Sequence, residues 1–397
     1  MRGIVGPKSE NPNFGETGKS SVSIPDPPYQ CLLARMATFI LFRPVRWWMS
    51  PEERLQTVLH GSEEVVTRDE LRTLLDRTDT PRAYVGLEPS GLMHVGTAFI
   101  VGSKVEDLIR AGFHTIIFLA DWHAYINDKL GRDLENLRIC ADYFKDGFRA
   151  VGVPESVEYL YANEFVRHRE YWQTVIQASK ASTVARIRRA LTIMGRKEEE
   201  ADLDASKLIY PAMQVADIHW MNLDLALGGM DQRHAHMLYR DVAPKLGWKQ
   251  VVALHTPLLP ALDGGGRMDL VAGKMSKSRP DASILLNDSS RDVERKIGKA
   301  FCPAKEPVGN PVLEIARLIL LPRRGKLMIP RDPKFGGDVT YASFNEVAKA
   351  YADGELHPKD LKAGVAAGLN ELLGPVRKFF KAHPQNLEAV NAILRNG

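Results

Sequence analysis

From residue 83 onward, the chain alternates between short apolar runs and longer amphipathic stretches. Apolar runs of four or five residues predict buried strands, and apolar positions spaced by three and four predict helices. The predicted strands cover 83–87, 115–119, 157–161, 223–227 and 251–254. The predicted helices cover 97–111, 133–151, 170–196, 207–222 and 231–246. This alternation is typical of an α/β fold with a doubly wound parallel sheet, in which ligands bind beyond the carboxyl ends of the strands.

The pattern changes after residue 285, where no further strand is evident. Helical spacing continues over 289–301, 310–320, 343–353 and 358–373, and in a tail from 384. The sequence therefore predicts two folded regions, an α/β region over 49–285 and a mainly α region over 286–397.

The first 48 residues differ in amino-acid composition from the rest of the chain. Residues 1–28 are rich in Pro, Gly, Ser and Asn, which predicts disorder. Residues 31–48 are apolar but broken by arginines and Pro44; they lack the pattern of a signal peptide, and an amphipathic anchor is an alternative. Ser50 and Thr67 start well-capped helical patterns, so we expect the folded protein to begin near Met49, after a disordered leader over 1–48.

The amino-acid composition of the chain excludes only a few classes of function. The 397 residues are 44% hydrophobic, which is enough to bury a large core. A net charge of +4 permits an anionic partner without requiring one. Three scattered cysteines predict reduced thiols in a cytoplasmic protein and no structural metal. No apolar run approaches the roughly 20 residues needed to span a bilayer, so no membrane partner is expected.

Residues 274–278 read Lys-Met-Ser-Lys-Ser and follow a glycine-rich run at 264–266. The ammonium groups of Lys274 and Lys277 can reach one polyanion as mobile point charges, which suits a triphosphate. A solvated basic turn is the alternative for this stretch alone.

A second motif runs from Gly86 to Thr97, where a predicted strand ends, a turn follows and a helix begins. Amide groups at a helix start attract phosphate, Gly96 leaves room for a nucleotide, and His94 can donate a hydrogen bond. A lone His-x-Gly is more often structural. Its pairing with the lysine motif makes a nucleotide site the stronger interpretation.

Tyr210, Gln214 and Asp217 are spaced i, i+4, i+7 on a helix whose other faces are mostly apolar. Such a polar stripe either meets polar groups of the protein or lines a ligand cavity, and the residues alone leave both open. The turn at 228–232, Gly-Gly-Met-Asp-Gln, either approaches a nucleotide or merely caps a helix. His123 follows a strand end, and we assign it no chemistry.

Together these motifs resemble the HIGH and KMSKS signatures of class I aminoacyl-tRNA synthetases. Further segments resemble the archaeal/eukaryotic-type tyrosyl-tRNA synthetases: YVGLEPSGLMH (84–94), LADWHAYIN (119–127), IYPAMQVADIH (209–219), GGMDQ (228–232), FGGDVT (335–340) and LHPKDLK (356–362). The resemblance runs from about residue 50 to about 380. It implies a Rossmann-like catalytic domain over 49–285 with a helical connective insert at about 133–205, an anticodon-binding domain over 286–397, and a homodimer.

The resemblance also implies roles for single residues. Tyrosine would be bound by Tyr84, Tyr210, Gln214, Asp217 and Gln232, with Tyr84 and Asp217 at its phenol and the others at its ammonium group. ATP, accompanied by Mg²⁺, would be bound by Gly86, His94, Gly96, Thr97, Gly228, Gly229, Asp231, Met275, Ser276 and Lys277. His94, Lys274 and Lys277 would be catalytic. Phe335 and Asp338 would contact the anticodon of tRNA(Tyr), and no editing step is expected.

Two positions depart from the family pattern: Thr97 replaces the second histidine of HIGH, and Ile319 stands where a stacking aromatic is expected. The basic helix at 180–197 would contact the tRNA acceptor stem or a second subunit, and the basic residues between 323 and 334 would lie near the anticodon. The alternatives are a tryptophanyl-type synthetase, a tRNA-independent amino-acid activator, and a catalytically silent tRNA-binding paralogue.

Overall fold

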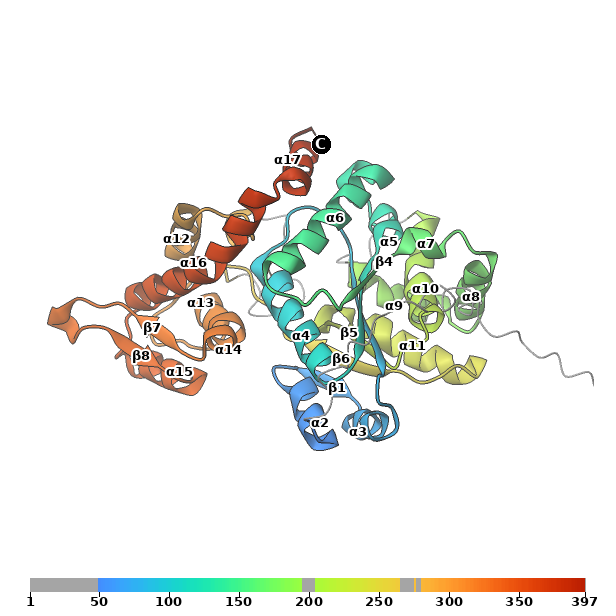
Figure 1. Ribbon diagram of the computed structural model, residues 1–397, viewed down its shortest axis with the longest axis horizontal. Coiled ribbons are helices and arrows are strands. Elements are labelled where there is room, and N and C mark those ends of the chain that lie inside the picture. Colours follow the sequence, from blue (N-terminus) through green and yellow to red (C-terminus); the bar gives the residue numbers. More distant parts are fainter. Residues whose placement is uncertain (1–48, 195–203, 265–274, 276–279, 397) are drawn as a thin grey trace, which may run out of the picture. The chain divides into compact units, whose positions relative to one another are not determined.

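A six-stranded sheet forms the centre of the first region (Figure 1). The computed structural model describes residues 49–194, 204–264, 275 and 280–396, so the expected leader over 1–48 lies outside the described residues. The strands lie in the order β1-β6-β5-β2-β3-β4. Their bounds are β1 Glu64–Val66, β2 Arg82–Leu87, β3 His114–Leu119, β4 Glu158–Tyr161, β5 Leu225–Gly229 and β6 Val252–Thr256.

The strands from β2 to β6 pair in parallel, which confirms the predicted doubly wound sheet. The edge strand β1 was not predicted, and it pairs antiparallel with β6. β1 is three half-buried residues long, too short to give a periodic signal. Because β3 and β5 flank β2 on opposite sides, the strand order reverses beside β2, where doubly wound folds bind ligands.

Helices fill the connections between these strands. Ser50 and Thr67 form the predicted capping boxes. The predicted helix over 170–196 is instead broken, because the side chain of Thr183 accepts a hydrogen bond from the amide of Arg186 and starts a new helix. The bounds are α2 Pro51–Leu59, α3 Arg68–Arg77, η2 Gly96–Val101, α4 Gly102–Arg110, α5 Asp121–Ile126, η3 Leu130–Arg132, α6 Leu134–Ala150, α7 Ala162–Phe165, α8 Arg169–Lys180, α9 Val184–Ala190, η4 Leu191–Met194, α10 Ala205–Trp220, η5 Met230–Gln232 and α11 Arg233–Leu246.

The region after residue 280 is mainly helical, as predicted, but the expectation of no further strand was wrong. Two short strands form a hairpin whose outward-facing Met328 lies between buried Leu327 and Ile329. Three residues carry too little alternation to predict such a strand. The bounds are η6 Pro280–Ala282, α12 Ser290–Lys299, α13 Pro311–Ile315, η7 Ala316–Leu320, α14 Leu321–Arg324, β7 Leu327–Ile329, η8 Pro333–Phe335, β8 Val339–Tyr341, α15 Phe344–Asp353, α16 Pro358–Ala382 and α17 Gln385–Asn396.

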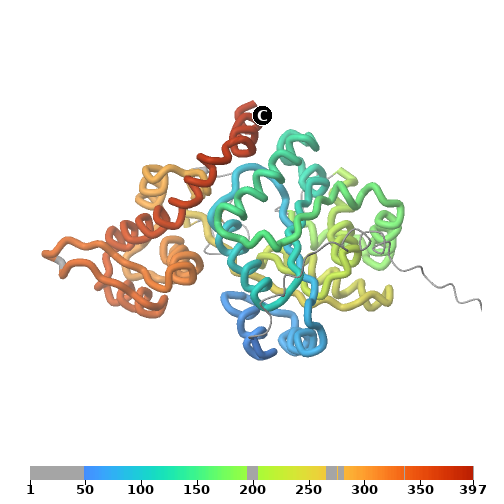
Figure 2. Tube along the Cα trace, viewed as in Figure 1, coloured from blue at the N-terminus to red at the C-terminus, as the bar shows by residue number. Residues whose placement is uncertain are grey.

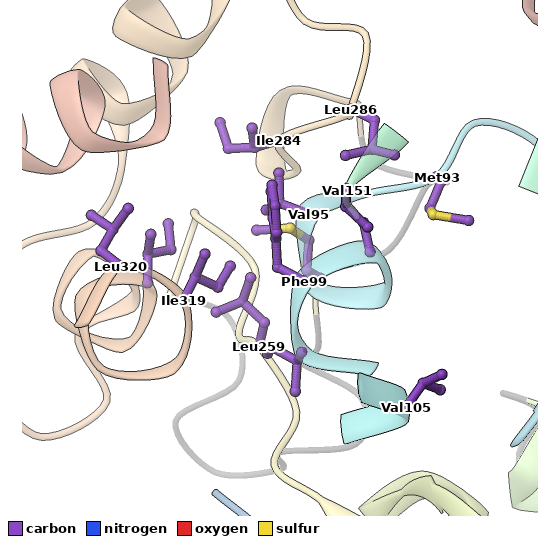
Figure 3. Close-up of a cluster of buried hydrophobic side chains, with 14 of the residues drawn as sticks. Met93, Val95, Phe99, Val105, Val151, Leu259, Ile284, Leu286, Ile319 and Leu320 are labelled. Atoms are coloured by element: carbon purple, nitrogen blue, oxygen red, sulfur yellow. The ribbon is translucent and has the colours of Figure 1, made fainter. Parts of the chain in front are cut away.

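One hydrophobic core continues across the expected boundary at residue 285. Val95, Phe99 and Leu259 belong to the same buried cluster as Ile284 and Ile319. Figure 3 shows these side chains gathered between the helix that holds Phe99 and the helix that holds Ile319. Full burial of Ile319 explains why no exposed stacking aromatic stands there. The division at 285 stays a prediction.

The last helices lead back to the first region (Figure 2). α17 packs against α6, and the amide of Asn386 donates a 2.8 Å hydrogen bond to Asp146. Among the helices that the structure describes, none is long and apolar enough to cross a membrane.

Candidate active site

A cavity of about 870 Å³ opens at the carboxyl ends of β2 and β5, where the strand order reverses. Every described residue assigned above to tyrosine or ATP lines it. These residues are Tyr84, Gly86, His94, Gly96, Thr97, Tyr210, Gln214, Asp217, Gly228, Gly229, Asp231, Gln232 and Met275. Lys274, Ser276 and Lys277 lie outside the described residues. The polar stripe on α10 therefore faces a cavity, the second of the two interpretations left open above.

Tyr84 and Asp217 lie at one end of this site, on β2 and α10, and each is 1% exposed. The Tyr84 hydroxyl makes no hydrogen bond of good geometry with any residue that the structure describes, although the Gln214 amide lies near enough to affect its pKa. Burial raises the pKa of Tyr84, and the Asp217 carboxylate raises it further, so the hydroxyl stays protonated. A buried hydroxyl without a partner is costly, and a bound polar group would relieve that cost.

Two groups that the sequence did not reveal hold Asp217. The Tyr171 hydroxyl, on α8, donates a 2.8 Å hydrogen bond to Asp217 Oδ1. His123 Nε2, on α5, lies 3.0 Å from Asp217 Oδ2. Burial lowers the pKa of His123, but the carboxylates of Asp217, Glu88 and Asp121 outweigh it, and the net pKa is raised. Tyr171 belongs to no motif, so only the packing of α8 against α10 brings it here.

Oxygen atoms converge further along α10. The Tyr210 hydroxyl donates a 2.5 Å hydrogen bond to Glu88, whose carboxylate also accepts from the amide of Asn127. The Gln214 amide donates to Gln232 at 3.3 Å, while Gln214 Oε1 is buried without a partner among the described residues. Sequence reasoning missed Glu88, although it stands inside the first motif. Such a cluster of oxygen atoms suits an ammonium group.

At the start of η2, the amide of Thr97 donates to His94 Nδ1 at 3.3 Å, and the Thr97 hydroxyl lies 3.2 Å from His94 Nε2. A Cβ at Gly96 would lie 3.0 Å from the His94 ring and 3.2 Å from Leu259 Cβ. A side chain at Gly96 would therefore press against the His94 ring and Leu259. The expectation that Gly96 also leaves room for a nucleotide stays a prediction. This glycine lets the imidazole fold over the helix start.

The turn after β5 needs its glycines for a similar reason. A Cβ at Gly228 would lie 2.8 Å from Gln232 Cβ, and one at Gly229 would lie 2.5 Å from Asp231 Oδ1. The two glycines therefore let the turn fold against its own side chains, which brings Asp231 and Gln232 to the cavity wall.

Behind this turn lies a chain of buried polar groups. His236 Nδ1 is 3.0 Å from His255 Nε2, and His255 Nδ1 is 2.9 Å from Glu64. Burial lowers the pKa of His236 to about 3, with a smaller contribution from His255. His236 is therefore neutral near pH 7.

Met275 fixes one point of the lysine motif beside the cavity. Its side chain is 2% exposed in the hydrophobic core, and its amide donates a 2.7 Å hydrogen bond to the carbonyl of Leu259. Leu259 also packs beside Gly96. Met275 is thus anchored next to the helix that follows His94.

Asp338, expected at the anticodon, does not line the cavity. Phe335 ends η8 between the strands of the hairpin, and exposed Asp338 accepts a 3.0 Å hydrogen bond from the amide of Arg331. Two arginines of the expected basic patch are engaged elsewhere, because Arg323 pairs with Glu106 and Arg324 pairs with Glu371. Within the described part of the chain, no group of three or more His, Cys, Asp or Glu side chains could hold a metal ion.

Comparison with known proteins agrees with this geometry. Residues 76–374 match the family described as tRNA synthetases class I (W and Y). The tyrosine–tRNA ligase of Saccharolobus solfataricus is 46% identical over 359 residues, which cover 88% of this chain and 98% of the relative.

Solved structures agree as well. The tyrosyl-tRNA synthetase of Aeropyrum pernix has a TM-score of 0.78 at 46% identity and covers 86% of this chain and 98% of its own. The enzyme of Pyrococcus horikoshii complexed with L-tyrosine has a TM-score of 0.81 at 41% identity and covers 87% and 100%. The protein therefore belongs to the class I tRNA synthetases for tryptophan and tyrosine and, within them, to the tyrosyl-tRNA synthetases of archaeal type.

Proposed function

We propose that the protein activates L-tyrosine with ATP to give tyrosyl-adenylate and pyrophosphate, and then transfers the tyrosyl group to the 3′ end of tRNA(Tyr). The observation that carries this proposal is the pair formed by Tyr84 and Asp217 at the wall of the same cavity as His94. The names of the relatives, tyrosine–tRNA ligases, support the amino acid and the tRNA.

Tyrosine is recognised at both of its ends. Its phenol donates to Asp217 and accepts from the Tyr84 hydroxyl, which no described residue satisfies. Phenylalanine lacks the hydroxyl and would leave the buried Tyr84 hydroxyl without a partner, and Asp217 without the donor that tyrosine brings, which is costly. Tyr210, Gln214 and Gln232 hold the ammonium group. Because the phenol is read directly, no editing step is needed.

The first reaction needs no nucleophile from the protein. A carboxylate oxygen of tyrosine bonds to the α-phosphorus of ATP, the bond to the β-phosphate oxygen breaks, and pyrophosphate leaves with the electron pair. Catalysis is then positioning together with stabilisation of charge on the phosphates. His94 donates a hydrogen bond there, and Lys274 and Lys277 supply positive charge. Mg²⁺ enters with ATP as part of the substrate. The glycines of both turns, with Thr97, Asp231, Met275 and Ser276, shape the nucleotide subsite.

In the second reaction a ribose hydroxyl at the 3′ end of tRNA attacks the acyl carbon, and AMP leaves. Phe335 and Asp338 meet the anticodon, by stacking and by accepting a hydrogen bond from a base edge. The protein works in the cytoplasm as a homodimer, with the basic residues between 180 and 197 at the acceptor stem or at the second subunit.

ATP–pyrophosphate exchange with each of the twenty amino acids tests this function, followed by charging of tRNA(Tyr). We expect exchange with tyrosine far above every other amino acid, and charging only of tRNA(Tyr). Preference for tryptophan would indicate the other branch of the family. Exchange without charging would indicate a tRNA-independent activator, and tRNA binding without exchange would indicate a silent paralogue.

A further inference from the structure

Asp217 is contacted by two groups from outside its own helix, one through a hydrogen bond and one through an ion-pair contact. The Tyr171 hydroxyl donates to Oδ1 at 2.8 Å, and His123 Nε2 lies 3.0 Å from Oδ2. The Tyr171 hydrogen bond holds one carboxylate oxygen, and the His123 ring lies against the other. Each oxygen keeps a second lone pair for another donor.

Tyr171 is itself immobile and lies outside the cavity lining. Its side chain is 0% exposed, and its ring packs against Phe165 and edge-on against Trp220. Its hydroxyl therefore reaches the ligand site only through Asp217. The ring of Tyr171 packs in the hydrophobic core, whereas its hydroxyl donates a hydrogen bond to the Asp217 carboxylate.

The Tyr84 hydroxyl gives the second, independent observation. It is buried, lies within electrostatic reach of Asp217, and makes no good hydrogen bond with the described residues. An unrestrained carboxylate would turn to accept this hydroxyl, because a buried donor without a partner costs free energy. The contacts of Asp217 with Tyr171 and His123 oppose that turn, and both phenol-reading groups remain available.

We propose that Tyr171 is a positioning residue that determines amino-acid specificity, because its hydroxyl holds Asp217 in the orientation that receives the phenol of tyrosine. This inference rests on the proposed function and deepens it. Loss of the Tyr171 hydroxyl frees Asp217 to close on Tyr84, and tyrosine must then break that contact before it binds. Phenylalanine makes no such contact, so its activation is indifferent to the change.

The test compares Tyr171→Phe with the unaltered protein in tyrosine- and phenylalanine-dependent ATP–pyrophosphate exchange. We expect kcat/KM for tyrosine to fall about tenfold or more, mainly through KM, as for the loss of a hydrogen bond to a charged group. KM for ATP and kcat/KM for phenylalanine should stay within about twofold. Tyr239→Phe is the matched control, because it removes another buried hydroxyl, which donates to the carbonyl of Lys249 at 2.8 Å.

A double variant asks whether Tyr171 acts through Asp217. In an Asp217→Ala background, Tyr171→Phe should change tyrosine activation by no more than about twofold. Thermal unfolding of every variant establishes that it is folded.

Three results would separate the explanations. If the unaltered protein does not prefer tyrosine, the proposed function itself fails. If it prefers tyrosine and Tyr171→Phe keeps that preference, only this inference is overturned. If Tyr171→Phe lowers activation of both amino acids equally, or acts fully in the Asp217→Ala background, its role is structural and the inference is again overturned.

Discussion

Arg323 on α14 donates a 2.8 Å hydrogen bond to the carboxylate of Glu106 on α4, and its guanidinium carbon lies 5.6 Å from the centre of the Phe99 ring. α4 continues directly from η2, which begins two residues after His94. The pair thus ties the region expected to read the anticodon to the helix that follows His94. Arg323 is half-buried and is engaged by these protein groups.

A double-mutant cycle measures the coupling free energy between Arg323 and Glu106. Arg323→Met and Glu106→Gln should each lower the free energy of unfolding, and together by less than the sum, with a coupling of about 1 kcal/mol. Urea unfolding supplies the values. Arg324→Met is the control, since it breaks an ion pair with Glu371 instead and should add independently to Glu106→Gln. Full additivity of Arg323→Met and Glu106→Gln would show that the two side chains do not stabilise each other.

Glu88 should contribute to tyrosine binding although no motif argument identified it. Glu88→Gln keeps the shape but removes the negative charge from the cluster proposed to hold the ammonium group. KM for tyrosine in pyrophosphate exchange should rise about tenfold, the size of one charge-assisted hydrogen bond, and KM for ATP should change little. Glu355→Gln, at an exposed position, should leave both constants unaltered. An unchanged KM for tyrosine in Glu88→Gln would remove Glu88 from the site.

Gly96→Ala should impair the activation step more than the fold. The added methyl group would lie 3.0 Å from the His94 ring, which can move, and 3.2 Å from Leu259. We expect the rate of tyrosyl-adenylate formation to fall about tenfold or more, because a displaced His94 donates poorly to the phosphates. Stopped-flow measurement at saturating substrates checks this rate. Gly298→Ala is the control, since no atom lies within 4 Å of the added carbon.

Protonation of His236 should make the fold sensitive to acid. Its folded pKa is about 3 because it is buried, with a smaller effect of His255, while an unfolded histidine has a pKa of about 6.5. Between these values the unfolded chain binds more protons, so stability falls as the pH falls from about 6.5 toward 3. The slope from this group approaches about 1.4 kcal/mol per pH unit.

Urea unfolding between pH 7 and 4.5 should show this slope, and His236→Gln should reduce it. The neighbouring His255 and Glu64 keep their own titrations, with Arg233 staying positively charged beside Glu64, so part of the slope remains. His383→Gln, at an exposed position, should leave the slope as it is. A His236→Gln variant with an unaltered slope would show that His236 titrates alike in both states.

Asp338 should separate the two halves of the reaction. Asp338→Ala should leave tyrosine-dependent pyrophosphate exchange intact and weaken charging of tRNA(Tyr), because the residue lies outside the cavity. The side chain also accepts from the amide of Arg331, so Asp338→Asn is a useful companion that can keep this bond. Charging lost in both variants indicates base recognition, and charging lost in Asp338→Ala alone indicates loop folding. Loss of exchange as well would indicate misfolding.

The sequence alone was enough for the parallel strands, since long buried runs such as 115–119 are set by local hydrophobicity. It also predicted the cavity residues of β2, α10 and the turn after β5, because resemblance to a family and the rule for strand ends both point there. Strands of only three residues are too short to show a pattern of apolar and polar positions, so β1 and the β7–β8 hairpin were missed.

Only the tertiary structure decided which groups act on Asp217. Tyr171 and Asp217 are 46 residues apart, and Tyr171 looks like an ordinary residue of an amphipathic helix. Their hydrogen bond exists because α8 packs against α10. The same holds for Gly96, because only the fold places His94 and Leu259 where a side chain at this position would lie. Local patterns fix which segments are buried, whereas the partners of a buried polar atom depend on contacts between segments distant in the chain.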